Sequence, residues 1–106
     1  MVAAMATVTG PATGLAEISR MASESVESWL REYEGYCGLV VLTDEEARTS
    51  RMLTFWDTYE AEVASRRARG AMRDQIVETA GMEVVDFGVY EVPVYEVVGP
   101  GRDRQE

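Results

Sequence analysis

The junction at residues 49–62 constrains the fold of this chain more than any other stretch. Its first half, Thr49–Trp56, has the side-chain alternation and the aromatic and β-branched content of a β-strand. Its second half has the signature of a helix start, because Asp57 is a suitable N-cap and Glu60 follows three residues later, as in a capping box. The chain is therefore expected to pass directly from a strand into a helix, with the indole of Trp56 at the boundary.

Four further elements are predicted from hydrophobic periodicity and turn signals. In chain order, the six elements are a strand over residues 4–9, a helix over 15–33, strands over 36–43 and 49–56, a helix over 58–80 and a long strand over 82–98. This βαββαβ order is that of the ferredoxin-like α+β fold, in which a four-stranded antiparallel sheet carries two helices on one face. Residues 1–98 are predicted to form this single domain, and residues 99–106 are predicted to be a disordered tail.

The two helices differ in the faces that they are expected to bury. The first carries apolar residues at three- and four-residue steps from Leu15 to Tyr33. The second is expected to bury small residues followed by two larger ones: Ala61, Ala64, Ala68, Ala71, Met72 and Ile76. Gly35 and Gly81 are expected to end the two helices. Pro93 marks a bulge or an edge in the last strand.

The composition excludes several classes of function. The chain has no histidine, the commonest metal ligand and general base, and a single cysteine, Cys37, which we expect to be a small core residue. A net charge of −9 has the wrong sign for nucleic-acid binding, and there is no glycine-rich nucleotide-binding motif. No apolar run approaches the roughly 20 residues of a membrane helix, and the N-terminus lacks a basic leader. We therefore expect a cytoplasmic protein that uses no metal or other cofactor and that binds neither nucleic acid nor a membrane.

Both faces of the predicted sheet are apolar, but two helices can cover only one of them. In the second strand, Val40 and Leu42 lie on one face, and Leu39 and Val41 lie on the other. A monomer rarely leaves so large an apolar surface in water, and two-fold dimers are the commonest assembly. We therefore predict a homodimer that pairs through the open sheet face, with the long C-terminal strand crossing to the partner.

Three segments carry a resemblance to a known group of proteins: Glu34–Gly38, Leu53–Ala61 and Val89–Val92. They are similar to the antibiotic-biosynthesis-monooxygenase-like (ABM) branch of the dimeric α+β barrel superfamily, and the resemblance spans residues 4–98. It implies a cofactor-independent monooxygenase that acts on, or binds, a small hydrophobic or aromatic molecule of polyketide type.

The same superfamily includes enzymes that degrade haem. When the strand-to-helix junctions are aligned, their axial histidine falls near Gln75, their second-helix tryptophan near Ser65 and their first-strand asparagine near Thr7. This chain departs from the pattern at all three positions, so haem degradation is not expected.

The resemblance implies that aromatic side chains near the boundary of helices and sheet hold the substrate. The residues predicted to bind it are Trp29, Tyr33, Tyr36, Arg51, Trp56, Tyr59 and Tyr90. Arg51 would stabilise a phenolate, but no catalytic acid or base can be named. Each residue also has a purely structural interpretation: core packing for those on the first helix, a staple between strand and helix for Trp56, cross-strand pairing for the sheet tyrosines and a salt bridge for Arg51.

The second predicted helix carries four arginines in an otherwise acidic chain: Arg66, Arg67, Arg69 and Arg73. Glu62 lies four residues before Arg66, which is typical of a solvated, salt-bridged helix face. The alternative is an anion-binding gate at the mouth of a pocket. Two classes of function therefore remain open: a small-molecule enzyme, and a non-catalytic dimer that binds a hydrophobic ligand or has a purely structural role.

Overall fold

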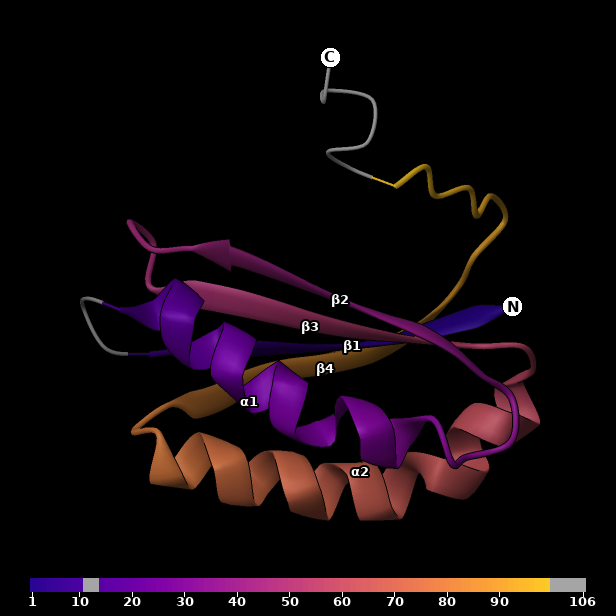
Figure 1. The fold of residues 1–106 in the computed structure, drawn as a ribbon, viewed down its shortest axis with the longest axis horizontal. Helices are drawn as coiled ribbons and strands as arrows, with labels where there is room; N and C mark the ends of the chain where they lie inside the picture. Colours follow the sequence, from indigo (N-terminus) through magenta and orange to yellow (C-terminus); the bar gives the residue numbers. More distant parts are fainter. Residues whose placement is uncertain (11–13, 100–106) are drawn as a thin grey trace.

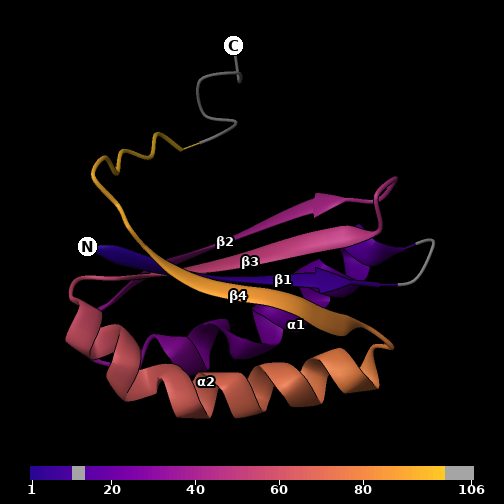
Figure 2. The same cartoon turned by 180° about the vertical axis from the view of Figure 1, so that it is seen from behind.

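Figure 1 shows the computed structural model, which describes residues 1–10 and 14–99. Its elements are β1 (Val2–Thr9), α1 (Leu15–Leu30), β2 (Tyr36–Asp44), β3 (Thr49–Trp56), α2 (Tyr59–Thr79) and β4 (Glu83–Glu91). The strands form one antiparallel sheet in the order β2-β3-β1-β4. Both helices lie on the same side of this sheet in the opposite views of Figures 1 and 2. The predicted ferredoxin-like α+β fold is therefore confirmed.

The central strand β1 allows the helices to approach the sheet closely, because its helix-facing side chains are small. Ala4, Ala6 and Val8 alternate along this strand, line the space below the helices and are almost completely buried. Leu15 and Leu30, at the two ends of α1, are buried as well. The apolar face predicted for the first helix is thus confirmed at both of its ends.

The junction between β3 and α2 has the predicted form, with a different capping residue. Trp56 ends the strand and is fully buried. The helix begins at Tyr59, and the N-cap is Thr58, whose hydroxyl accepts a hydrogen bond of 3.0 Å from the N–H of Ala61. The prediction of Asp57 as the N-cap is therefore wrong, and the cap lies one residue later. Threonine and aspartate cap helices in the same way, so the residue types alone do not distinguish the two positions.

The helix ends follow the predicted glycines only in part. After α2 ends at Thr79, Gly81 adopts a left-handed conformation with φ of +73°, as predicted. The prediction for α1 was wrong, because this helix ends at Leu30 and Gly35, with φ of +86°, lies in the turn before β2. Tyr33 lies in a turn after the end of the helix, and its N–H donates to the carbonyl of Leu30 at 3.1 Å.

The last strand is shorter than the one predicted for residues 82–98. β4 ends at Glu91, because Pro93 has no N–H to donate to a strand ladder. The following segment has no regular secondary structure. The ring of Tyr95 packs edge-on against Phe55 at 5.2 Å between centroids, so this segment covers part of the sheet face that lies away from the helices.

The inner face of α2 agrees with the prediction at Met72 and Ile76, which line the space between helices and sheet, but differs from it at the alanines. Ala64, Ala68 and Ala71 are exposed. The buried residues of the helix are Glu62, Ser65 and Val77. Small residues would let the helix lie close to the sheet, but polar side chains can be buried instead when they satisfy one another's hydrogen bonds.

Cys37 was predicted to lie in the core, and the structure exposes it instead. The pairing of β2 with β3 shifts between Tyr36 and Gly38, so Cys37 falls at an irregularity where strict alternation does not hold. Its thiol lies 3.4 Å from the carbonyl oxygen of Gly35.

The sheet face opposite the helices carries a second apolar surface. Residues directly opposite each other on paired strands point to the same face, and Val40, Leu53 and Met5 form such a row across three strands. Leu42 and Tyr90 lie on this face and are 53% and 50% exposed. The helices therefore cover one face of the sheet only, as predicted.

No helix in the described part of the chain combines the length and the apolar character that a membrane crossing needs. Of the predicted disordered tail, residues 100–106 lie outside the described residues. The single domain over residues 1–98 and the cytoplasmic location stay predictions.

Candidate functional site

A cavity of about 90 Å³ lies between the two helices and the sheet. Most of its lining is apolar and comes from every layer of the fold, including Val26 and Trp29 of α1 and Met72 and Ile76 of α2. Polar groups also line it, and Thr54 and Arg69 are two of them. No carboxylate of the described residues reaches the lining. The cavity therefore offers an apolar interior that contains a few hydrogen-bonding groups.

One of these polar groups, Arg69, belongs to an ion-paired cluster in the first half of α2. The side chain of Glu62 is completely buried, and its carboxylate accepts a hydrogen bond of 2.6 Å from Nη2 of Arg69, whose side chain is only 10% exposed. The more exposed Arg66 binds the same carboxylate through Nε at 3.0 Å and through Nη2. The predicted pair between Glu62 and Arg66 is thus confirmed, but it is not part of a solvated face.

Burial and ion pairing act against each other in this cluster. Burial opposes the ionisation of Glu62, but the hydrogen bonds from Arg66 and Arg69 outweigh it and hold the pKa of this carboxyl below its usual range. Burial lowers the pKa of Arg69, although Glu62 opposes that change. The cluster contains one carboxylate and two guanidinium groups, so it carries a net charge of +1 in a chain whose net charge is −9.

Arg69 joins this cluster to the strand-to-helix junction. Its guanidinium carbon lies 4.9 Å from the centroid of the Trp56 ring, in a cation–π arrangement. Its Nη1 donates to Oγ1 of Thr54 at 3.3 Å, and Nε1 of Trp56 donates to the same oxygen at 2.9 Å. The indole therefore fastens β3 to α2, as its structural interpretation predicted, and it also positions Thr54 and Arg69 beside each other.

Four of the residues predicted to bind substrate form two aromatic pairs on the helix side of the sheet. The rings of Trp29 and Tyr33 meet edge-on at 5.0 Å, and those of Tyr36 and Trp56 meet edge-on at 5.6 Å. Burial, followed by the nearby Glu27, raises the pKa of Tyr36. Of these four residues, only Trp29 lines the cavity itself.

The other three predicted residues lie away from the cavity. Tyr59 begins α2 and is 52% exposed, with the guanidinium of Arg66 at 5.9 Å from its ring. Arg51 and Tyr90 lie on the open face of the sheet. They pair with Thr7 and Ala3 of β1, and these two residues alternate with the helix-facing residues of that strand. The structure therefore does not bring Arg51 together with the aromatic pairs.

Thr54 was not predicted as a site residue, and Arg69 was considered only as part of an anion-binding gate, although the sequence contains a signal for both. Thr54 lies two residues before Trp56 and so must share its strand face. Steps of three and four residues from Glu62 lead through Ser65 to Arg69, which places the three on one helix face. Such a polar stripe is usually assigned to solvent, and only the packing shows that it is buried.

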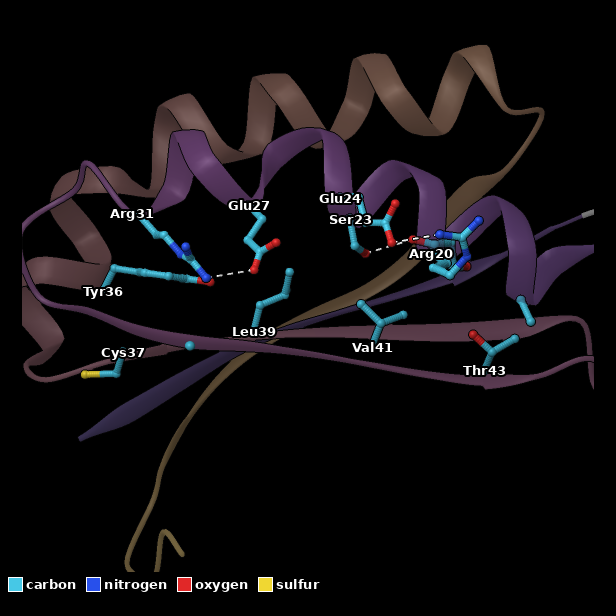
Figure 3. A pocket seen from close by; sticks show the side chains of 13 residues that line it. Arg20, Ser23, Glu24, Glu27, Arg31, Tyr36, Cys37, Leu39, Val41 and Thr43 are labelled. Carbon is cyan, nitrogen blue, oxygen red and sulfur yellow. Dashed lines mark hydrogen bonds and ion pairs between the residues drawn. The ribbon is translucent and has the colours of Figure 1, made fainter. Parts of the chain in front are cut away.

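A larger groove of about 790 Å³ runs between α1 and β2 (Figure 3). Side chains of Leu39 and Val41 rise from the strand toward the helix, and charged residues of α1 lie above them. Glu27 is one of these residues, and it forms an ion pair at 2.9 Å with Arg31, which directly follows the helix. Ser23 and Leu39 line both the groove and the cavity. A single layer of side chains therefore separates the two spaces.

The described residues contain no group of three or more cysteine, aspartate or glutamate side chains that could hold a metal ion. The arginine cluster has its carboxylate already bound by two guanidinium groups. The arrangement can hold an apolar molecule beside hydrogen-bond donors.

The fold and the cavity define the class of protein as a ferredoxin-like α+β protein with an apolar chamber between helices and sheet. No protein-family model matches the sequence, and no curated protein is significantly similar to it. Several solved structures do resemble it, and they confirm the predicted resemblance to the ABM-like superfamily at the level of the fold.

Two of these structures are oxygenases from Streptomyces. One is a point variant of SnoaB, a cofactor-independent oxygenase from Streptomyces nogalater, with a TM-score of 0.66, 10% identity and coverage of 89% of this chain and 94% of that chain. The other is the ActVA-Orf6 monooxygenase of Streptomyces coelicolor in complex with nanaomycin D, with a TM-score of 0.63, 18% identity and coverage of 92% and 91%.

A third structure has a different activity on the same fold. It is the haem-degrading protein MhuD of Mycobacterium tuberculosis with two haems bound, with a TM-score of 0.65, 16% identity and coverage of 92% of this chain and 100% of that chain. Since one fold carries both activities, the fold does not by itself decide the reaction.

Proposed function

We propose that this protein binds a small hydrophobic, preferably aromatic molecule between its helices and its sheet, and oxidises it with dioxygen without a cofactor. The observation that carries the proposal is an apolar cavity with hydrogen-bond donors from Thr54 and Arg69. Support for the oxidation comes from the SnoaB and ActVA-Orf6 structures, whose proteins are named as oxygenases on this fold.

The size of the cavity sets a condition on the ligand. Pockets for small molecules usually enclose roughly 300–1,000 Å³, and a benzene ring has been accommodated in about 150 Å³. The present 90 Å³ is smaller, so ligand binding must displace side chains. Met52, Met72 and Met82 line the cavity, and methionine adapts its shape more readily than other apolar residues. Movement of Leu39 would join the cavity to the groove beside α1.

The proposed reaction takes its electrons from the substrate. In an anthrone-type compound, a methylene group becomes a carbonyl, one atom of dioxygen enters the product and the other leaves as water. The protein would supply a dry chamber and donors that stabilise the ionised substrate. Glu62 is a poor base, because both of its carboxylate oxygens accept hydrogen bonds from arginines and its pKa is low. The substrate should therefore be acidic enough to ionise unaided.

The test is oxygen uptake with anthrone and dihydroxynaphthalene substrates. We expect uptake that rises with protein concentration and is abolished by Met72→Trp, which fills the cavity. Arg67→Gln is the matched control, because Arg67 is exposed on the same helix. No uptake across the panel, or equal uptake by the Met72→Trp variant, would contradict the proposed reaction.

The alternative is a non-catalytic protein that binds a hydrophobic ligand in the same cavity. The lack of a free base at the site favours it, since Glu62 is fully engaged. Ligand binding without oxygen uptake would identify this case. Haem degradation has less support, because Gln75 is exposed and Thr7 lies on the sheet face away from the helices.

We also propose that two copies pair through the open sheet face. The support is the row of apolar side chains around Leu53, together with Val94 and Val97, which are 81% and 67% exposed in the C-terminal segment. Sedimentation at micromolar concentration should give a dimer, and Leu53→Glu should give a monomer. Val63→Glu is the control, because Val63 is an exposed apolar residue on the helical side. A wild-type protein that sediments as a monomer would refute this proposal.

A further inference from the structure

The hydroxyl group of Thr54 has an unusual set of partners at the wall of the cavity. Its oxygen accepts one hydrogen bond from Nε1 of Trp56 at 2.9 Å and a second from Nη1 of Arg69 at 3.3 Å. A hydroxyl oxygen has two lone pairs and one proton, so both of its acceptor positions are occupied. Within residues 1–10 and 14–99 no hydrogen bond uses its proton, and Thr54 can therefore act toward a ligand only as a donor.

Arg69 has a spare donor at the same place. A guanidinium group has five N–H bonds. One from Nε goes to Ser65 at 2.9 Å, and two from Nη2 go to the carbonyl and the carboxylate of Glu62 at 3.1 and 2.6 Å. One of the two N–H bonds of Nη1 goes to Thr54. The second N–H of this nitrogen is therefore left over, on the atom that already touches the Thr54 hydroxyl.

No carboxylate of the described residues beside these two donors is free to accept a hydrogen bond from a ligand. The carboxylate of Glu62 is bound by Arg66 and Arg69, and the cavity lining contains no other carboxylate among the described residues. The net positive charge of the cluster also favours an electron-rich atom. Because Ser65, Glu62 and Trp56 hold both donors in place before any ligand arrives, the donors themselves need little reorganisation on binding.

We infer that Thr54 and Arg69 form a two-donor site for a single oxygen atom of the ligand, either a carbonyl or a phenolate. This inference rests on the proposed function and specifies its ligand class. Ring ketones, quinones and phenols fit the site, whereas hydrocarbons leave two donors without a partner, and amines or ammonium groups meet donors and positive charge. In an oxidation, the same pair holds the oxygen on which negative charge develops.

The test compares acetophenone with ethylbenzene, which has a similar shape and no acceptor. One hydrogen bond from the Thr54 hydroxyl and one from the charged Arg69 guanidinium should give the wild-type protein a preference of at least roughly tenfold for acetophenone in an NMR titration. The infrared carbonyl band of bound acetophenone should lie at lower frequency than in an apolar solvent. Thr54→Val should remove most of the preference and shift the band back, and Thr54→Ser, which keeps the hydroxyl, should retain both.

The outcomes separate this inference from the proposed function. If both compounds bind equally well, or if the carbonyl band is unshifted, the two-donor site is wrong and hydrophobic binding stands. If neither compound binds, the inference and the proposed function both fall. The infrared band of the wild-type protein decides the question even where Thr54→Val proves too unstable to fold.

Discussion

Replacing Glu62 by glutamine should lower the free energy of unfolding by about 3 kcal/mol at pH 7. Removing one partner of a buried ion pair usually costs roughly 3–5 kcal/mol, because the other charge stays buried without compensation. Here the buried partner is Arg69, which keeps its hydrogen bonds to Ser65 and Thr54, so the lower end of the range applies. The contact with the more exposed Arg66 adds little. Glutamine has nearly the same volume, so no cavity term contributes.

The assay is urea unfolding followed by tryptophan fluorescence, since Trp56 lies beside the cluster. For a domain of about this size the expected loss lowers Tm by roughly 12–24 °C. The matched control is Glu17→Gln, which removes a carboxylate paired with Arg20 on the exposed face of α1 and should leave stability unchanged within error. A loss below about 1 kcal/mol for Glu62→Gln would refute the argument that the cluster behaves as a buried ion pair.

The pH dependence gives an independent check with a defined sign. The pKa of Glu62 is lower in the folded protein than the usual value of about 4.3 in an unfolded chain. Its stabilisation is therefore fully present above that value, and it is lost as the pH falls through the folded pKa. The difference in stability between the wild type and the glutamine variant should be constant from neutral pH down to about 5 and should narrow below about 4. A difference that widens with acidification contradicts the assignment.

Two further predictions concern the turns that hold the helices in place. Gly35→Ala should destabilise the protein by more than the ~1–2 kcal/mol of a left-handed residue, because its Cβ would lie 2.5 Å from Cβ of Ala61 and 2.6 Å from Oδ1 of Asp57. Gly81→Ala, in open space at a similar φ, is its control in chemical denaturation and should show the conformational cost alone. Thr58→Ala should cost about 1 kcal/mol through the lost N-cap, and Thr58→Asp should restore it. Equal losses for the two glycine variants, or an unchanged Thr58→Ala protein, would count against these contacts.

Local signals in the sequence determined the order of the elements and much of their extent. Alternation and composition are sufficient for β3, whose predicted and observed bounds agree. Periodic apolar residues are sufficient for the buried face of α1, and Gly81 marks the end of α2. These features depend on neighbours within a few residues, which is why one sequence can specify them. Pro93 is a local signal of the same kind for the end of β4 at Glu91, because proline has no N–H to donate to a strand ladder.

The candidate site depended on tertiary packing. Arg69 is buried only because Glu62 on its own helix and Thr54 and Trp56 on a distant strand supply its partners together. From the helix sequence alone, the polar stripe is expected to face solvent and the neighbouring alanines to face the core. Both expectations are wrong, because Glu62 and Ser65 are buried and Ala64 and Ala68 are exposed. The free energy of burying a charge depends on partners that only the folded chain brings within hydrogen-bonding distance. The sequence therefore determined which elements form, whereas the three-dimensional packing decided which polar residues became the interior of the site.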